Sequence, residues 1–485
     1  MLANDACVSR RKLLAGSVRL TALASNWPWW GDVNSGRNQV QPLRITVNTQ
    51  RALGVIPTNF TGLGYEISSV ARPGLLSATN GTYVQLVRTL GAAGVVRVGG
   101  NTSDYSSFAP EGTPVSSPKG TVVTQRNLQE LGTFLDATGW KLIWGLNLGG
   151  GTEQQAVEEA EAVLAAAKDK LLAFEIGNEP DLFGRRAAHR PESYSYNDYL
   201  SEYRRFKAAI RAKLPNTPFA GPDAAGATDW VTRFATDEGK DLKLLTYHYY
   251  RECANPTSNL DKLLHPDPKL APQLQKLRAA SASSHVPYRI CETNSFCGGG
   301  KPGVSDTFGS ALWVLEYMFT LASADAAGVN IETGVNQLGF ISWYSPIGDD
   351  EHGVYSARPE YYGMLAFAQA QRGQRVHVDY DAGSLNITAY AVLSDRNRLS
   401  VVIVNKDASG EADVTIAADA HLARAHVLRL RGPSLESKDG VTLGGSSVTL
   451  NGDWKPKLLE PLRIRSGACA IRVPAASAAI VNAEA

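Results

Sequence analysis

Short apolar runs alternate with longer segments of helical periodicity from about residue 59 to residue 364. A run such as LLAFEI, residues 171–176, has the continuous apolar character of a strand buried in a parallel sheet. A segment such as QQAVEEAEAVLAAAKDK, residues 154–170, spaces its apolar residues as an amphipathic helix does. This alternation predicts a parallel sheet of βαβ units. Eight runs start at residues 59, 95, 141, 171, 218, 244, 288 and 339, and eight strands close a (β/α)8 TIM barrel.

After about residue 370 the pattern changes to short strands in which apolar and polar residues alternate. Gly, Asp and Asn separate them, which is typical of an antiparallel β-sandwich. RITVNT, residues 44–49, alternates in the same way and should add a strand to this domain. The predicted parts are a leader at 1–40, a joining strand at 41–50, the barrel at 51–368 and the sandwich at 369–485. The predicted sandwich strands are RVHVDY, LNITAYAV, LSVVIVNK, ADVTIAA, HVLRLR, SVTLNG and ACAIRVP.

The first forty residues have the features of an export leader. Arg10 and Arg11 precede a short, weakly apolar segment followed by small residues, which is the pattern of a twin-arginine signal. We therefore expect an exported protein, periplasmic or secreted. Arg19 interrupts the apolar segment, so a cytoplasmic protein with a ragged N-terminus is the alternative. No later run approaches the roughly twenty apolar residues that span a bilayer, and no membrane span is expected.

Charge and cysteine spacing narrow the classes of function. The formal net charge of +1 gives no overall attraction to nucleic acid or to an anionic membrane. The five cysteines lack the spacing of a zinc site, so no metal is expected. Cys253 and Cys297 fall just beyond neighbouring predicted strands on one face of the barrel. A disulfide between them and two free buried thiols are both compatible with the sequence.

Two glutamates end predicted strands that face each other across the barrel mouth. Glu179 follows the fourth run in FEIGNEPDLF, and Glu292 ends the seventh in YRICETNSF. Chemistry in such barrels takes place at the carboxyl ends of the strands. Two carboxylic acids held there meet the requirement of a retaining glycosidase, in which one is the nucleophile and the other acts as acid and then base. Asn178, beside Glu179, is a candidate for binding a sugar hydroxyl.

Other polar side chains end the same runs. His248 and Tyr250 close the sixth run, beside the seventh, and a tyrosine hydroxyl donated to Glu292 would keep that carboxylate ionised and aimed. Ordinary packing of both side chains is the alternative. The predicted mouth of a cleft for a hydroxyl-rich ligand is formed by the ends of six runs, at Glu66, Asn101, Asn147, Glu179, Tyr250 and Glu292.

Three segments together resemble one known family. IGNEPDLF, TYHYY and ETNSFCGGGKPGVSDTF are similar to motifs of the heparanase and β-glucuronidase family of retaining glycoside hydrolases, glycoside hydrolase family 79. The resemblance extends from about residue 41 to the C-terminus. It implies a (β/α)8 barrel with a β-sandwich built from both chain ends. It also implies Glu179 as acid/base, Glu292 as nucleophile and no cofactor.

The same resemblance implies the substrate contacts. Asn178 matches the amide that holds the sugar 2-hydroxyl, and Tyr250 matches the tyrosine next to the nucleophile. Glu66 and Asn101 stand where family members contact the glycone.

The glycine run after the seventh strand suits an anion. Consecutive glycines let backbone N–H groups approach an anion without obstruction, and in the family this segment helps to hold the glucuronate carboxylate. We therefore predict Gly298 and Gly299 as substrate contacts. Cys297 departs from the family, because many members have a tyrosine there. Tyr344, on the predicted eighth strand, is the candidate for the missing hydroxyl, and a flexible loop is the alternative meaning of the glycines.

A basic segment, GRRAAHR at residues 184–190, leaves the catalytic face just after Glu179. Its Arg185, Arg186 and Arg190 either meet sulfates or carboxylates of a longer sugar chain or form a solvated loop.

We expect a retaining hydrolase of β-D-glucuronide linkages, a β-glucuronidase or heparanase-like enzyme, whose partner is a glucuronide or an acidic oligosaccharide such as heparan sulfate. A retaining hydrolase of a neutral sugar is the first alternative, and it follows if the glycine run is remote from the two carboxylates. A non-catalytic carbohydrate-binding barrel is the second.

Overall fold

The computed structural model describes residues 40–115, 117–185, 189–335, 341–350, 352–394, 398–420 and 422–484. All of these residues belong to one compact unit of the chain, Asn38–Ala485. The predicted leader lies outside the described residues, apart from Val40.

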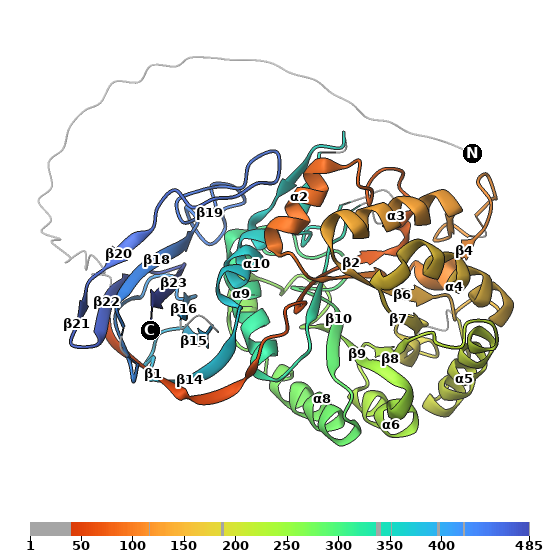
Figure 1. The fold of residues 1–485 in the computed structure, drawn as a ribbon, viewed down its shortest axis with the longest axis horizontal. Helices are drawn as coiled ribbons and strands as arrows, with labels where there is room; N and C mark the ends of the chain where they lie inside the picture. The colour runs from red at the N-terminus through yellow and green to blue at the C-terminus, as the bar shows by residue number, and fades with distance from the viewer. Residues whose placement is uncertain are drawn as a thin grey trace, which may run out of the picture. The chain divides into compact units, whose positions relative to one another are not determined.

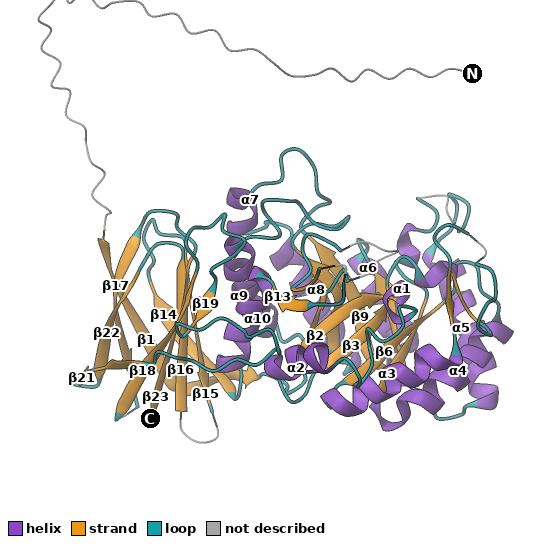
Figure 2. Ribbon diagram, turned by 90° about the horizontal axis from the view of Figure 1, so that it is seen from above, coloured by secondary structure: helices purple, strands orange, loops and turns teal. Residues whose placement is uncertain are grey.

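Eight parallel strands form a closed barrel in the order β10, β11, β2, β3, β6, β7, β8, β9, which confirms the predicted fold class. Nearly all their residues are buried, because side chains fill the inside and helices cover the outside (Figure 2). The strands are β2 (Thr61–Glu66), β3 (Val95–Gly99), β6 (Lys141–Leu146), β7 (Leu171–Ile176), β8 (Phe219–Ala224), β9 (Leu242–Tyr250), β10 (Tyr288–Asn294) and β11 (Val329–Glu332).

Helices connect the strands along the outside of the barrel (Figure 1). Three of them, α3, α4 and α5, begin with a capping box, formed at Thr124, Thr152 and Ser195. No helix in the described ranges is long and apolar enough to cross a membrane. The helices are α1 (Ile67–Val70), α2 (Gly81–Leu90), α3 (Gln125–Thr138), α4 (Glu153–Ala167), α5 (Tyr196–Lys213), α6 (Thr228–Glu238), α7 (Leu260–Leu264), α8 (Leu270–Ser284), α9 (Phe308–Ser323) and α10 (Pro359–Ala370).

The eighth barrel strand is β11, and the prediction that it starts at residue 339 is wrong. The sequence of β11, VNIE, places polar side chains in a buried strand, so the more apolar GFISWYS was the better match to the pattern. Asn330 is satisfied inside the barrel by bonds to Arg289 and to two backbone carbonyls. Residues 336–340 lie outside the described part of the chain, and Tyr344 lies in a turn instead of on a strand.

The C-terminal domain is one curled sheet of eleven strands, antiparallel except for a single pair. Strand β1 (Val40–Val55) lies in the middle of it, parallel to β17 and antiparallel to β14. Burial alternates along β1 from Leu43 to Thr49, since one face packs on the core and the other faces solvent. The other strands are β14 (Gln374–Tyr380), β15 (Ile387–Leu393), β16 (Arg398–Asn405), β17 (Glu411–Ala418), β18 (Arg424–Arg431), β19 (Thr442–Leu443), β20 (Glu460–Leu462), β21 (Ile464–Arg465), β22 (Ala468–Val473) and β23 (Ser477–Glu484).

Several details of this sheet differ from the prediction, and the short strands β19, β20 and β21 were not predicted. The run SVTLNG, residues 447–452, is not a strand. The last strand, β23, was missed, although it pairs with both β16 and β18. Its sequence SAAIVNAE is rich in alanine, which has little preference for strands, and it is buried on both faces and therefore lacks alternation.

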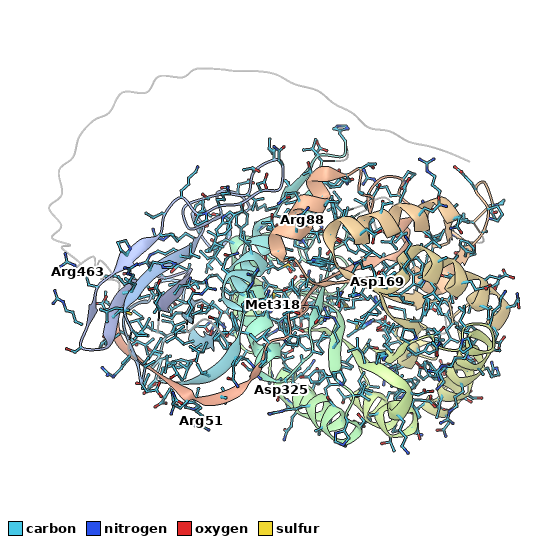
Figure 3. The ribbon with its side chains drawn as sticks, viewed as in Figure 1. Arg51, Arg88, Asp169, Met318, Asp325 and Arg463 are labelled. Atoms are coloured by element: carbon cyan, nitrogen blue, oxygen red, sulfur yellow. A yellow bond between two sulfur atoms is a disulfide. The ribbon has the colours of Figure 1, made fainter. Side chains whose placement is uncertain are left out.

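Helices α9 and α10 join the barrel to the sheet. Almost every residue of α10 is buried, as expected for a helix covered on all sides. Val402, Leu428 and Ile480 of the sheet belong to the same hydrophobic core as these helices. Met318 of α9, labelled in Figure 3, is fully buried in that core. The two domains therefore share a continuous apolar interior.

A buried carboxyl between α4 and β6 should make stability depend on pH. Glu159 accepts a hydrogen bond from Trp144 Nε1 at 2.8 Å. Burial raises the pKa of Glu159 to about 7, although this bond opposes the shift. A carboxyl group whose pKa is raised by folding favours the folded state most at pH values below its unfolded-state pKa, about 4.3. This contribution is lost as the pH rises through the folded-state pKa.

Glu159→Gln keeps the hydrogen-bond acceptor and removes the titration. Between about pH 4.5 and about pH 8, we expect the free energy of unfolding of the parent to fall by about 3 kcal/mol relative to that of the variant. Urea unfolding at each pH measures this difference. Glu158→Gln, at the exposed neighbouring position, is the control and should follow the parent. Parallel pH profiles for the parent and Glu159→Gln would contradict the prediction.

Candidate active site

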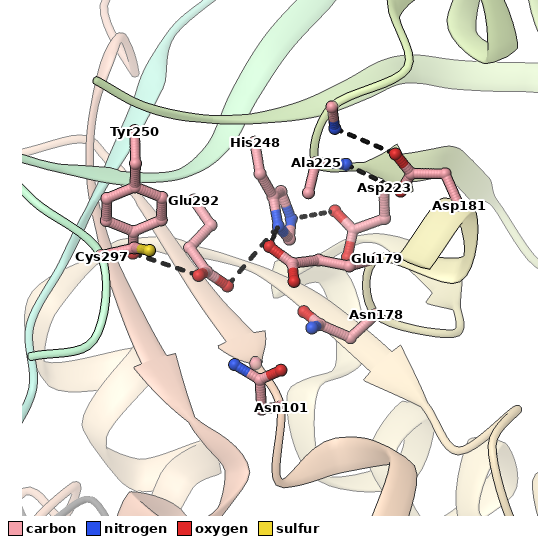
Figure 4. A network of polar contacts seen from close by, with 12 residues as sticks. Asn101, Asn178, Glu179, Asp181, Asp223, Ala225, His248, Tyr250, Glu292 and Cys297 are labelled. Carbon is pink, nitrogen blue, oxygen red and sulfur yellow. Dashed lines mark hydrogen bonds and ion pairs between the residues drawn. The ribbon is translucent and has the colours of Figure 1, made fainter. Parts of the chain in front are cut away.

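A cavity of about 560 Å³ opens at the carboxyl ends of the barrel strands. Figure 4 shows the polar side chains gathered there. Asn178 and His248 are buried and belong to the hydrogen-bond network behind the cavity. The other eight predicted site residues line it directly, namely Glu66, Asn101, Glu179, Tyr250, Glu292, Gly298, Gly299 and Tyr344.

A sharp turn at the end of β7 places Glu179 on the cavity wall. Gly177 has φ 84° and Glu179 has φ 52°, in the left-handed region that costs a residue other than glycine free energy. Pro180 then begins a short 3-10 helix. The N–H of Glu179 donates to the carbonyl of Asp223 at 3.0 Å, which holds the turn against β8.

Glu292, on β10, is held from two sides. Its Oε2 accepts a bond from Arg97 Nη1 at 2.9 Å, and its Oε1 accepts one from the Tyr250 hydroxyl at 3.1 Å. Both donors fix the position of this carboxylate. One oxygen of Glu292, one of Glu179 and a ring nitrogen of His248 all lie within 4.8 Å of one another. This spacing suits a retaining glycosidase, whose carboxyl groups lie about 5 to 5.5 Å apart.

Arg97, at the centre of this network, was missed by the sequence reasoning. It is fully buried on β3 and donates to Glu175 at 3.0 Å, to Glu292 and Asn178 at 2.9 Å, and to Asp223. A charge buried this deeply is stable only when it is paired and hydrogen-bonded. An arginine inside the apolar run VVRVGG was the available signal, because a buried strand leaves its side chain no route to solvent.

Asp223 and His248 form a charged pair beside the two glutamates, with Asp223 Oδ1 2.6 Å from His248 Nε2. Burial raises the pKa of Asp223, but Arg97 and His248 outweigh burial and lower this pKa to about 2. Burial lowers the pKa of His248, but the carboxylates of Asp223 and Glu292 outweigh burial and raise this pKa well above its ordinary range. His248 is therefore an imidazolium whose Nδ1 lies 3.4 Å from Glu179 Oε1 and 3.7 Å from Glu292 Oε2.

Glu179, Glu292 and His248 also have the spacing of three ligands to one metal ion. A histidine binds a metal only through an unprotonated nitrogen. Asp223 is bonded to Nε2 of His248, so a metal ion at this cluster would have to displace the proton on Nδ1. A second cluster with the spacing of metal ligands consists of Glu175, Asp223 and Cys291. The guanidinium of Arg97 donates to both carboxylates of this cluster.

Glu66, at the end of β2, is bonded to the loop after β3. Its Oε1 accepts the N–H of Asn101 at 3.1 Å, and its Oε2 accepts the N–H and hydroxyl of Thr102 at 2.7 and 2.6 Å. Burial and the nearby charge of Glu292 raise the pKa of Glu66 to about 7, although these bonds oppose the shift. Glu66 thus exchanges a proton near neutral pH while it lines the cavity.

Two predicted amides have different roles. Asn178 Oδ1 accepts from Arg97, and its Nδ2 has no hydrogen-bond partner among the described residues, so one donor remains for a ligand. Asn147, expected at the mouth, instead holds the loop after β6. Its Nδ2 donates to the carbonyl of Ser106 at 2.7 Å, and its Oδ1 accepts two N–H groups of the following glycines.

Residues 298–300 are glycines with φ of 78°, 86° and 85°, a succession that only glycine adopts readily. The backbone N–H groups of Gly298 and Gly299 make no hydrogen bond to another described residue, which leaves two donors for an anion. A disulfide between Cys253 and Cys297 fixes the start of this loop. The N–H of Trp343 donates to the carbonyl of Gly299 at 2.7 Å and fixes its other side.

Tyr344 reaches the cavity from the turn after β11. Its ring stacks near that of Tyr250, with the ring centroids 6.4 Å apart. It is buried and lines the same cavity as the glycine loop.

In the basic segment after Glu179, not every arginine is free to meet a sulfate or carboxylate of a substrate. Arg190 donates to Glu202 through Nε and Nη2 and to two loop carbonyls through Nη1. Its guanidinium therefore holds the loop and is not available to a substrate. Arg185 is exposed, and Arg186 lies outside the described residues.

Comparison with known proteins agrees with this arrangement. Residues 389–480 match the model of the glycosyl hydrolase family 79 C-terminal beta domain. The C-terminal domain is a family 79 domain. A β-glucuronidase of Aspergillus niger is 27% identical over 372 residues, which are 70% of this chain and 68% of that protein. A heparanase of Bos taurus is 23% identical over 261 residues, 50% of this chain and 45% of that protein.

A solved structure resembles nearly the whole chain. The 4-O-α-L-rhamnosyl-β-D-glucuronidase of Fusarium oxysporum 12S has a TM-score of 0.73 and 19% identity, over 90% of this chain and 99% of that one. At this identity the likeness concerns the fold. Together the comparisons confirm the resemblance to the heparanase and β-glucuronidase family and the prediction of a glycoside hydrolase.

The charge of His248 should depend on Asp223. In Asp223→Asn the burial of the imidazole is no longer offset by this carboxylate, so we expect the pKa of His248 to fall. Titration of isotope-labelled histidine by NMR measures it. Asp181→Asn is the control, because Asp181 accepts backbone N–H groups of residues 225–227 and has no bond to His248. An unchanged His248 titration in Asp223→Asn would contradict the assignment.

Proposed function

We propose that this family 79 chain is a retaining β-glucuronidase or heparanase-like enzyme that cleaves β-D-glucuronide linkages by double displacement. The observation that best supports the proposal is the pair of carboxylates, Glu179 and Glu292, with oxygens within 4.8 Å and unequal surroundings. Arg97 and Tyr250 bind the carboxylate of Glu292 from two sides and hold it in place, as a nucleophile requires. Glu179 projects from a strained turn on the facing strand.

The reaction takes place in two steps. Glu292 attacks the anomeric carbon while Glu179 gives its proton to the glycosidic oxygen, so the bond to the leaving group breaks as the bond to Glu292 forms. Glu179 then takes a proton from water, and the water oxygen displaces Glu292 from the sugar. Arg97 and Tyr250 bind the nucleophile carboxylate before the first step and after the second. Asn178 Nδ2 provides a donor for a sugar hydroxyl close to the reacting carbon.

A carboxylate-bearing sugar fits the rest of the cavity. The free N–H groups of Gly298 and Gly299 lie in the same cavity as the catalytic pair, together with Tyr344. The neutral-sugar alternative required the glycine run to be remote from the pair, so this placement supports a glucuronide. The β-glucuronidases among the relatives support the same substrate class.

Export is part of the proposal. The disulfide between Cys253 and Cys297 supports an oxidising compartment, since such bonds persist in the periplasm and outside the cell. The arginine pair at residues 10 and 11 supports the twin-arginine route.

The roles of the two glutamates predict different losses. Glu292→Ala should abolish turnover of every glucuronide, whereas Glu179→Ala should keep turnover of a dinitrophenyl glucuronide, whose leaving group needs little protonation. Azide added to Glu179→Ala should restore activity and yield a β-glucuronyl azide. Steady-state kinetics and product analysis measure both effects. If both variants lose both substrate types equally, the assignment fails.

The disulfide should affect the binding of glucuronides more than catalysis. In the double variant Cys253→Ser, Cys297→Ser the glycine loop loses its anchor, so we expect KM for nitrophenyl glucuronide to rise about tenfold, or about 1.4 kcal/mol, with kcat within about twofold. Any turnover of nitrophenyl glucoside should change little. Cys469→Ser, a buried free thiol in the sheet domain, is the control. An unchanged KM for the glucuronide would remove the loop from substrate recognition.

A further inference from the structure

A second cavity, of about 540 Å³, lies outside the active site. It lies between helices α8 and α9 of the barrel and strand β15 of the sheet domain. Its volume nearly equals that of the catalytic cavity and falls within the range of small-molecule sites. The proposed function makes no use of it.

The end of β9 separates the two cavities. Successive side chains of a strand point to opposite faces. Tyr250 and Glu252 line the catalytic cavity, whereas Tyr249 and Arg251 line the second one. The second cavity is therefore a separate space behind the catalytic wall.

Three aromatic side chains form an apolar wall of the second cavity. The rings of Trp313 and Tyr317 stack with centroids 5.1 Å apart and planes 13° apart. The ring of Tyr249 stacks on Tyr317 at 5.7 Å and 23°. Rings stacked in this way form a rigid apolar wall.

Two polar groups on the same cavity have bonding capacity left. Arg251 Nη1 donates to the carbonyl of His265 at 2.7 Å, and its guanidinium forms no ion pair within the described part of the chain. A guanidinium has five N–H donors, so others remain available. Asp267 accepts the Tyr249 hydroxyl at 2.7 Å and the N–H of Lys269 at 3.0 Å, and a carboxylate can accept about four bonds.

The other charges on this cavity are already paired. Arg278 Nη2 lies 2.7 Å from Asp325 Oδ2. Glu316 pairs with the buried Lys406. The unused donors of Arg251 and the unused acceptor capacity of Asp267 are thus charged features that a ligand would meet, beside the polar side chains of His265, Gln275 and Thr388.

We propose that this second cavity binds a sugar ring. A pyranose has an apolar face that packs on the aromatic wall, and hydroxyls that both accept from Arg251 and donate to Asp267. A flat apolar molecule would desolvate these two charged groups without bonding them, which costs free energy. The chemistry is the same for a free monosaccharide and for one unit of a longer saccharide. The inference does not depend on glucuronide cleavage in the first cavity.

The test measures sugar binding by tryptophan fluorescence of the whole chain, since Trp313 lies on the cavity wall. The protein carries Glu292→Gln to prevent turnover and Trp343→Phe to remove the tryptophan beside the glycine loop. Methyl β-glucoside and sodium glucuronate are the probes, and oligosaccharides of two to six units show whether the site prefers a longer chain. We expect a saturable change in emission with at least one of the two monosaccharides.

Variants then locate the site. Added separately, Arg251→Met and Asp267→Asn should each weaken binding of that probe at least tenfold. Arg278 lines the same cavity, but its charge is already paired. Arg278→Met should therefore change the affinity less than threefold. Each substitution is also made in the otherwise unmodified chain. Turnover of nitrophenyl glucuronide by these variants shows that the barrel has folded. The inference is overturned if neither monosaccharide gives a saturable change, or if Arg251→Met and Asp267→Asn bind as the parent does. Loss of glucuronide turnover in the unmodified chain would count against the proposed function and would leave this titration informative.

Discussion

A guanidinium inside a barrel must be surrounded by groups that bond it, and the geometry of this active site follows from that requirement. Arg97 is fully buried, and its donors reach Glu175, Glu292, Asn178 and Asp223. Removing any of these partners would leave part of a buried charge unsatisfied, at a cost of several kcal/mol. One side chain on β3 thus fixes the positions of groups on β7, β8 and β10.

The charges around Arg97 nearly balance, which explains how so many acids share one enclosed space. Two cations, Arg97 and the His248 imidazolium, face the carboxylates of Asp223 and Glu292. Burial, together with the charge of Asp223, raises the pKa of Glu175 to about 7. Glu175, the fifth ionisable group of the network, is therefore protonated much of the time near neutral pH. The carboxylate of Glu292 therefore belongs to a network that carries no large net negative charge.

The barrel and the positions of Glu179, Glu292 and Tyr250 could be predicted because each lies at the end of a regular apolar run. The apolar run around Arg97 indicated that this residue is buried, but its partners and those of Asp223 could not be predicted, because they come from other strands. Strand β11 was missed because its polar Asn330 is satisfied only by bonds across the barrel. Arg190 was read as a possible substrate contact because its partner, Glu202, comes close only in the fold. Local patterns therefore identified the elements, and long-range bonds determined what the polar residues do.

The two glutamates and the glycine loop lie on elements of different rigidity. Glu292 lies on a strand bonded on both sides within the barrel, and Glu179 directly follows one, so neither can move without disturbing the core. Gly298 and Gly299 lie on a loop, and a loop of glycines would by itself lose much conformational freedom on binding an anion. The disulfide at Cys297 and the bond from Trp343 restrict this loop before the substrate arrives. Less ordering would then remain to oppose the binding of an anion at this loop.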